Sequence, residues 1–411
     1  MNVIFWIILV AVILEFALGS LSVIVNMRSL KTSPPVGLED VYDETKYRDS
    51  QEYTRVQSRF GLFVGSFDLL VLLAFWFCGG FNYVDQQVRA AGLNEIITGI
   101  LFVGVLLIIN TLIKIPFNLY GTFVIEEKFG FNKTTYFTYF VDTLKGTIVS
   151  AVILIPLLAG VLYFFEYTGS LAWLYVFMFL TITTLFIQII APVWIMPIFN
   201  KFTPLGEGKL RDAIVEYAEK VKFTFGNIYV IDGSRRSAHS NAFFAGFGKT
   251  KRIALFDTLI DQLTTDEIVS VIAHEVGHNK KRHIISGMVL GILQTGIFCF
   301  LLSLFIENEM LFNAFYMEDT SIYASLLFFG LLLTPLNLVT GPIMAAISRK
   351  HEYEADHWAI ETTIDRDHLI IGLKKLAEKN LSNLSPHPLF VVLNYSHPPL
   401  LDRINTIRNI G

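Results

Sequence analysis

Seven long apolar stretches run along the chain, and polar segments separate each one from the next. Each stretch holds about 20 mostly apolar residues, which is the length that an α-helix needs to cross the hydrocarbon core of a bilayer. They lie near residues 2–24, 60–82, 96–116, 146–165, 172–195, 286–306 and 322–347. The pattern therefore predicts a mainly α-helical, multi-pass membrane protein with seven transmembrane helices.

The polar segments divide the chain into four predicted parts. The first part is an N-terminal membrane region over 1–195, with five helices and cytoplasmic loops at 25–59 and 117–145. A polar domain follows over 196–285, then transmembrane helices six and seven over 286–347, and finally a second polar segment over 348–411. We expect the acidic, tyrosine-rich stretch 36–58 to form a loop or a short helix.

Basic residues alternate between the segments, which predicts an orientation. They follow the first stretch and lie between the third and fourth, whereas Arg89 alone separates the second from the third. None occurs between the fourth and fifth or between the sixth and seventh. Cytoplasmic loops carry the excess of Lys and Arg, so we expect the N-terminus outside and the C-terminus in the cytoplasm. The first stretch has no basic residue before it and no small-residue cleavage site, which favours a retained helix over a signal peptide.

Composition supports the membrane assignment and narrows the chemistry. Apolar residues make up 53% of the chain and the net charge is −4, without a basic run that would suit nucleic acid. Cys78 and Cys299 both fall within apolar stretches, so neither a disulfide framework nor a cysteine metal site is expected. Several polar residues lie at membrane depth, where such groups usually face a bundle interior or a watery cavity. They are Glu15, Asp68, Asn110, Lys114, Gln188, Gln294 and Asn337.

The motif HEVGH at 274–278 carries the clearest chemical signal. Residues four apart share one face of a helix, so His274 and His278 can bind one zinc ion while Glu275 reaches the attacking water. Thr264 and Glu267 fit a capping box ten residues upstream, which supplies the helix that the motif requires. A chance occurrence of HExxH is the alternative, and the helical context argues against it.

A catalytic zinc site uses three protein ligands, so one more is expected after the seventh stretch. Helical spacing there places two carboxylates and two small residues on one face. They are Glu352, Ala355, Asp356 and Ala359. Glu352 is the predicted third ligand, and Asp356 is predicted to accept a hydrogen bond from a ligand histidine. His351 and Glu354 project elsewhere, and we interpret His239 and His283 as bystanders. An exposed charged helix is the alternative for this segment.

These motifs, taken together, resemble the Ste24 type of CAAX prenyl protease in the M48 family of membrane zinc metallopeptidases. The resemblance also includes segments 126–132, 200–205, 240–248, 252–259 and 396–404, and it covers nearly the whole chain in order. It implies seven helices around a large water-filled chamber, with a cytoplasmic zincin-like domain that carries a small β-sheet and one zinc ion per chain.

The same resemblance implies roles for residues outside the ligand set. It makes His397 and Arg403 candidate donors to the oxyanion and Asn241 a substrate-binding residue. From the residues alone, His397 sits in a rigid turn before two prolines, Arg403 could be a plain helix residue, and Asn241 a turn residue. Residues 252–256 read as a strand whose exposed edge, around Ala254, could pair with an extended peptide.

Several functions stay open at this stage. The first is a zinc endopeptidase that cuts near the C-terminus of prenylated CAAX substrates. A membrane quality-control protease of broader specificity is the second, and a transporter is the third and least favoured. A catalytically dead scaffold is unsupported, because HEVGH and Glu352 are intact. The chain ends at 408–411 without a basic retrieval tail, which favours a bacterial inner membrane over the endoplasmic reticulum.

Overall fold

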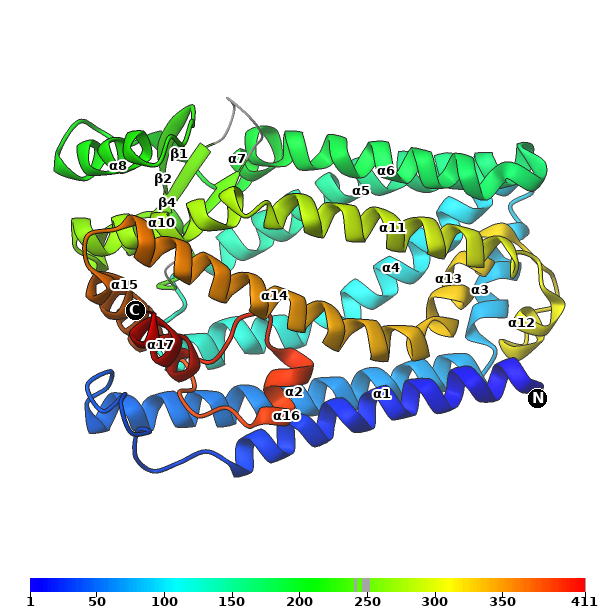
Figure 1. The fold of residues 1–411 in the computed structure, drawn as a ribbon. Coiled ribbons are helices and arrows are strands. Elements are labelled where there is room, and N and C mark those ends of the chain that lie inside the picture. Colours follow the sequence, from blue (N-terminus) through cyan, green and yellow to red (C-terminus); the bar gives the residue numbers. More distant parts are fainter. Residues whose placement is uncertain (240–241, 246–251, 411) are drawn as a thin grey trace.

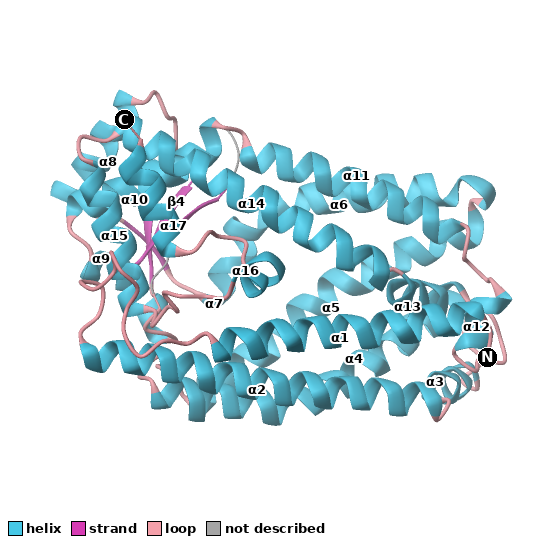
Figure 2. Cartoon of the chain, turned by 60° about the horizontal axis from the view of Figure 1, so that its bottom comes forward, coloured by secondary structure: helices cyan, strands magenta, loops and turns pink. Residues whose placement is uncertain are grey.

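The structure is a computed structural model, and it describes residues 1–239, 242–245 and 252–410. Long helices run side by side along the molecule, and a mixed helix and sheet domain lies at one end (Figure 1). The N-terminus lies at the opposite end of the bundle from the C-terminus in both views (Figures 1 and 2). An odd number of crossings produces such an arrangement.

Within the residues that the structure describes, six helical segments are long and apolar enough to cross a membrane, and a bent pair of helices supplies up to one more. The six are α1 (Val3–Arg28), α2 (Glu44–Phe77), α4 with the π-helical turn η1 (Glu95–Glu126), α5 (Tyr136–Tyr167), the run of η2, α6, η3 and α7 (Gly169–Phe199), and α11 (His283–Ser303). The bent pair joins α13 (Ile322–Leu332) to α14 (Thr334–Thr362) at 57°. Two short helices, α3 (Gly80–Arg89) and α12 (Glu309–Ala314), lie at the N-terminal end of the bundle. The prediction of a multi-pass helical membrane protein is confirmed.

Helix α2 begins well before its apolar part. The side chain of Asp43 caps it by accepting a hydrogen bond from the backbone N–H of Lys46 at 2.8 Å. Tyr47 is buried in the apolar core at the C-terminal end of the bundle. The expectation of a loop or short helix over 36–58 was therefore wrong from Glu44 onward. A single cap and a few buried side chains stabilise these helical turns. Their polar composition lacks the apolar periodicity that would have predicted a helix.

Most of the remaining elements form the domain at the C-terminal end of the bundle. Its strands are β1 (Phe202–Pro204), β2 (Asn227–Ile231), β3 (Ala242–Ala245) and β4 (Arg252–Phe256), in the order β1-β2-β4-β3. Its helices are α8 (Lys209–Lys220), α9 (Asp257–Gln262), α10 (Thr265–Lys280), α15 (Arg366–Lys379) and α17 (Leu400–Asn409), with the short turn η4 (Gly233–Arg235). Helix α16 (Pro388–Asn394) instead packs against α1 and α14 along the bundle (Figure 1). Within the described residues, β4 pairs with β2 on one side and β3 on the other.

This strand order corrects one prediction. The exposed sheet edge was expected along 252–256, but Ala254 lies in the interior of the sheet and is only 1% exposed. Strand β3 takes the outer position instead. Strand order depends on pairings between distant segments, which local sequence pattern does not encode.

Among the described residues, the two larger apolar cores lie at the two ends of the bundle. One joins α8, α10, α15, α17 and the sheet at the C-terminal end, and the other joins α1, α3, α4, α12 and α13 at the N-terminal end. A third, small cluster joins α5, α6 and α11. The spanning segments between these cores are poorly buried, with only 6% of the apolar window inside the protein for both α2 and α11. Low burial of this kind is expected of a hollow bundle. The chamber itself stays a prediction that follows from the resemblance.

Gly277 marks the closest approach of α10 to α14. A Cβ atom at Gly277 would lie 3.0 Å from both the Cα and the carbonyl oxygen of Ala355, and 3.1 Å from the Cβ of Trp358. Because backbone atoms cannot move aside cheaply, only glycine lets the two helices touch at this point. The contact places the HEVGH segment directly against α14.

We expect Gly277→Ala to destabilise the protein by about 1–3 kcal/mol, because the added methyl group would force α10 away from α14. Thermal unfolding of the purified protein in detergent measures the change. Gly287→Ala in α11 is the matched control, since a Cβ there would meet nothing within 4 Å. Equal unfolding temperatures for the two variants would contradict the close-approach argument.

Candidate metal centre

Helix α10 presents the HEVGH residues from a firmly capped start. The Thr264 side chain accepts from the backbone N–H of Glu267 at 3.4 Å, and the Glu267 carboxylate accepts from the backbone N–H of Thr264 at 2.9 Å. This arrangement is the capping box that the sequence predicts. Lys375 of α15 also donates to both oxygens of Glu267 at 2.8 Å. The cap therefore fixes α10 to a second helix as well.

Helix α14 brings the second half of the site. The four residues of its predicted inward face are all buried, as expected: Glu352, Ala355, Asp356 and Ala359. The two alanines let α14 pack closely on α10, and the two carboxylates then face the histidines across the contact. The prediction of one inward-facing stripe is confirmed.

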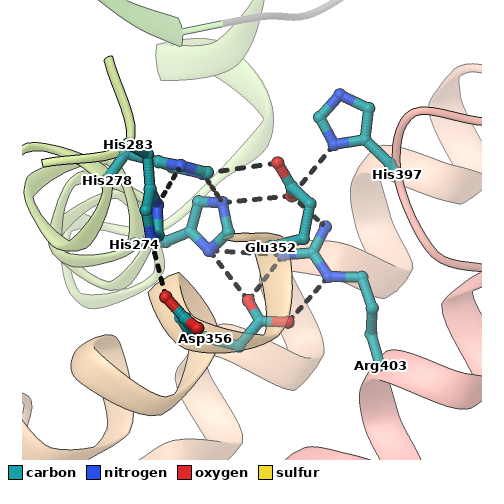
Figure 3. Close-up of polar contacts among 8 residues, drawn as sticks. His274, His278, His283, Glu352, Asp356, His397 and Arg403 are labelled. Atoms are coloured by element: carbon teal, nitrogen blue, oxygen red, sulfur yellow. Dashed lines mark hydrogen bonds and ion pairs between the residues drawn. The ribbon is translucent and has the colours of Figure 1, made fainter. Parts of the chain in front are cut away.

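Three side chains converge at this contact (Figure 3). The Nε2 atoms of His274 and His278 lie 3.2 Å apart. Glu352 Oε2 lies 3.4 Å from His274 Nε2, and Glu352 Oε1 lies 3.3 Å from His278 Nε2. Ligands about 2.0–2.1 Å from a tetrahedral zinc ion are separated by about 3.3–3.4 Å, and the separations here are of that size, with each oxygen of Glu352 near one of the two histidines.

The donor set also suits a metal. Glu352 Oε2 is buried and makes no hydrogen bond of good geometry, although His397 Nδ1 lies 2.9 Å away. A buried carboxylate oxygen normally has a partner, and a cation among these three side chains would provide one. Within the described residues, His274, His278 and Glu352 form the one cluster of three such side chains that could hold a metal ion.

Asp356 supports the cluster from behind. Its Oδ1 accepts a hydrogen bond from His274 Nδ1 at 2.8 Å, which fixes the ring with Nε2 toward the other two side chains. Arg403 donates to both oxygens of Asp356, from Nη2 at 2.6 Å and from Nε at 2.8 Å. A buried carboxylate that orients a ligand histidine is a common arrangement at metal sites.

Burial and hydrogen bonding shift the ionisation of these groups in opposite directions. Burial lowers the pKa of His274, but its hydrogen bond to Asp356 and the nearby carboxylate of Glu352 outweigh burial and raise it to about 9. Burial raises the pKa of Glu352, yet the surrounding imidazoles of His274, His278 and His397 hold it well below its usual range. The cluster therefore favours a positive charge at its centre. Metal binding to such ligands displaces protons.

Glu275 lies beside the cluster without belonging to it. It lines a pocket of about 530 Å³ together with His274, Glu352, His397 and Arg403. Burial raises the pKa of the Glu275 carboxyl above its ordinary value. A carboxylate with a raised pKa suits a general base that works near neutral pH.

The other predicted site residues have different positions. His397 is 67% exposed and directs Nδ1 at Glu352, while the Arg403 side chain is 11% exposed and is held by Asp356 (Figure 3). Ala242 of β3 lines the pocket, whereas the predicted Ala254 is buried one strand further in. Asn241 lies outside the described residues.

One residue that the sequence did not reveal contacts the site. His283, interpreted above as a bystander, lies with Nδ1 3.0 Å from His278 Nδ1. Its Nε2 lies 2.9 Å from Glu354, which was expected to project elsewhere. The left-handed backbone of Arg282, with φ at 61°, turns His283 back toward α10. Helical spacing alone has no signal for such a turn.

We expect Asp356→Asn to destabilise the protein by about 3 kcal/mol, because it leaves the buried guanidinium of Arg403 with Glu352 as its nearest anion, at 3.8 Å. Thermal unfolding in detergent is the measurement. Asp261→Asn, an exposed change of the same kind in α9, should unfold like the unmodified protein. If both variants unfold alike, Asp356 does not carry the buried charge of Arg403.

Two family models match consecutive parts of the chain. Residues 24–201 match the model described as CAAX prenyl protease N-terminal, five membrane helices. Residues 204–411 match the model of peptidase family M48. Together the two matches cover both the membrane region and the candidate metal centre.

Known proteins resemble the chain over nearly its full length. CAAX prenyl protease 1 of Saccharomyces cerevisiae is 35% identical, with 91% of this chain and 88% of that protein covered. The CAAX prenyl protease 1 homologs of Arabidopsis thaliana and Homo sapiens are 36% and 30% identical, covering 91% and 92% of this chain and 90% and 89% of theirs. The crystal structure of S. mikatae Ste24p matches with a TM-score of 0.94 at 33% identity, covering 99% of both chains.

Proposed function

We propose a zinc-dependent cut near the C-terminus of prenylated CAAX substrates, from the premise that this chain belongs to peptidase family M48 and is a Ste24-type membrane metalloendopeptidase. Such an enzyme acts on peptide or protein substrates at a membrane. The zinc ion, one per chain, and the prenylated substrate are the parts that we propose. Relatives named CAAX prenyl proteases support the substrate class.

The observation that carries the proposal is the convergence of His274, His278 and Glu352 at separations of 3.2–3.4 Å. Zinc, when bound by these three side chains, polarises a carbonyl and lowers the pKa of water. Glu275 is proposed to take the proton from the attacking water and to deliver it to the leaving amine. Both transfers are open to a side chain that lines the same pocket as the ligands.

His397 and Arg403 are proposed to stabilise the negative charge that develops on the substrate carbonyl oxygen. The exposed ring of His397 can donate its Nδ1 proton to Glu352 or to that oxygen. Arg403 keeps two donors on Asp356 and lies close enough to the pocket to add a positive charge. Asp356 itself is proposed to hold His274 in place.

The pocket and the sheet suggest how the peptide is held. Strand β3 is one of the two edge strands of the described sheet, and Ala242 at its start lines the pocket. An extended peptide could add to that edge by backbone pairing. Asn241, which lies outside the described residues, stays a proposed substrate-binding residue by resemblance. Apolar side chains also line the pocket, and they suit the aliphatic side chains of a CAAX sequence. They include Leu259, Val271, Leu369, Leu373, Leu376 and Leu400.

The orientation in the membrane follows from charge. We propose the N-terminus outside and the peptidase domain in the cytoplasm, because basic residues gather on the side of that domain. The four-part division at residues 195, 285 and 347 and a bacterial inner-membrane location rest on the sequence alone. The comparisons do not favour the quality-control or transporter alternatives, and we propose no nucleic-acid partner.

Peptide cleavage with matched substrates tests the proposal. The purified protein would receive a farnesylated CAAX peptide or its unprenylated twin, each with and without a chelator, and zinc would be restored after chelation. We expect cleavage of the farnesylated peptide that chelator abolishes and zinc restores. Equal zinc-dependent cleavage of both peptides would refute the prenyl requirement, and chelator-resistant cleavage would refute the metal centre.

A further inference from the structure

His283 occupies an unusual position between the metal centre and the membrane region. Helix α10 ends at Lys280, and α11 begins at His283 after a turn through Arg282, whose φ is 61°. The turn folds His283 back so that its ring packs beside His278, and the residue is only 7% exposed. A buried imidazole needs partners for both ring nitrogens.

Both partners are present. His283 Nδ1 lies 3.0 Å from His278 Nδ1, and His283 Nε2 lies 2.9 Å from Glu354 Oε2. The ring of His351 stacks on His283, with centroids 4.0 Å apart and planes within 8°. Figure 3 shows His283 beside His278, on the side away from His397. The ring of His283 is thus held by two polar contacts and one stacking contact.

His278, His283 and Glu354 form a hydrogen-bond chain, and the positions of its protons follow from the ligand geometry. His278 directs Nε2 at His274 and Glu352, so a neutral His278 that ligates through Nε2 carries its proton on Nδ1. That proton must be donated to His283 Nδ1, which therefore acts as the acceptor. The proton of His283 then resides on Nε2 and is donated to Glu354. Every donor in the chain has one acceptor.

We propose that His283 and Glu354 are positioning residues for His278. The inference rests on the proposed metal-dependent function, because it takes His278 as a ligand. Glu354 orients His283, and His283 fixes the tautomer and the ring orientation of His278, as Asp356 does directly for His274. His283 is the first residue of α11, so the hydrogen-bond chain also connects this membrane-spanning helix to the metal centre.

Helix α14, which carries Glu354, also carries a matched control pair. His357 and Glu361 of α14 also form a histidine–carboxylate contact, at 3.4 Å, but their side chains are 48% and 53% exposed. Loss of Glu361 removes the same charge from the same helix as loss of Glu354. Only the loss of Glu354 should reach the metal.

The test measures zinc affinity by chelator competition and steady-state hydrolysis on the purified full-length protein. We expect His283→Ala to weaken zinc binding about 10–100-fold and to lower kcat far more than it changes KM. His283→Gln should restore much of the affinity, because its amide oxygen can accept the His278 proton. Glu354→Ala should weaken zinc binding less than His283→Ala, and Glu361→Ala should leave it unchanged.

A variant that carries both His283→Ala and Glu354→Ala distinguishes a hydrogen-bond chain from two independent effects on zinc binding. Because Glu354 acts through His283, adding Glu354→Ala to His283→Ala should weaken zinc binding no further. Additive losses would overturn the proposed chain, as would unchanged zinc affinity in His283→Ala. If His283→Ala does not fold, Glu354→Ala against Glu361→Ala decides the matter, since equal affinities would refute the proposal. Failure of the unmodified protein to bind zinc would instead refute the proposed function.

Discussion

Glu275→Gln is expected to lower kcat for peptide hydrolysis by about 10³-fold while the metal stays bound. The amide has nearly the shape of the carboxylate but cannot take a proton from water. Glu275 lies outside the ligand cluster, so its loss should leave the metal content unchanged. Hydrolysis of a farnesylated peptide and zinc content, both measured on the purified protein, give the two readouts.

Asp266→Asn is the matched control for this change. It removes one negative charge from the same helix at an exposed position, so kcat should stay within a factor of two or so of the unmodified protein, as is usual for surface substitutions. A Glu275→Gln variant that hydrolyses peptide at the normal rate would remove Glu275 from the proton transfers. Loss of zinc in that variant would show that Glu275 also supports the metal.

Glu352→Ala is expected to abolish both tight zinc binding and hydrolysis. Even residues that only orient metal ligands change affinity by about 10–100-fold, so the loss of a ligand should exceed about 100-fold. The change also removes the carboxylate whose two oxygens lie 3.3 and 3.4 Å from the histidine nitrogens. Zinc affinity by chelator competition and peptide hydrolysis across a zinc titration are the measurements.

Two further variants make the Glu352 result specific. Glu361→Ala, an exposed change on the same helix, should bind zinc and cleave peptide normally. Glu352→Gln keeps one neutral oxygen donor and should regain part of its activity at high zinc concentration. Normal zinc affinity in Glu352→Ala would mean that another side chain is the third ligand.

Local sequence pattern predicted the parts of the molecule that depend on short-range geometry. The apolar stretches gave the spanning helices, because their length is set by the thickness of the bilayer. The capping box of α10 and the buried stripe of α14 also follow from helical periodicity. The same periodicity predicted that Glu352 lies on the inward face of its helix. Glu352 lies in the predicted cluster, although it comes 74 positions after His278 in the sequence.

Features that depend on turns and distant pairings were not predictable in the same way. The place of β4 inside the sheet follows from its pairing with both β2 and β3. The contact between His283 and His278 depends on one left-handed residue, Arg282. The early start of α2 depends on the cap at Asp43 and on burial of Tyr47 against remote helices. Each depends on a single conformation or on a remote contact, and none has a repeating pattern.

The three candidate metal ligands are divided between α10 and α14, and this division has a consequence for biosynthesis. Between His278 and Glu352 the chain passes through α11 and then through the bent pair α13 and α14. A nascent chain that has inserted its helices only as far as α11 possesses both histidines and the proposed general base, Glu275, but it lacks the carboxylate of Glu352. On the proposed function, proteolytic competence therefore arises only after the last membrane helix has been placed, and we expect unfinished or misinserted copies to be inactive toward neighbouring proteins.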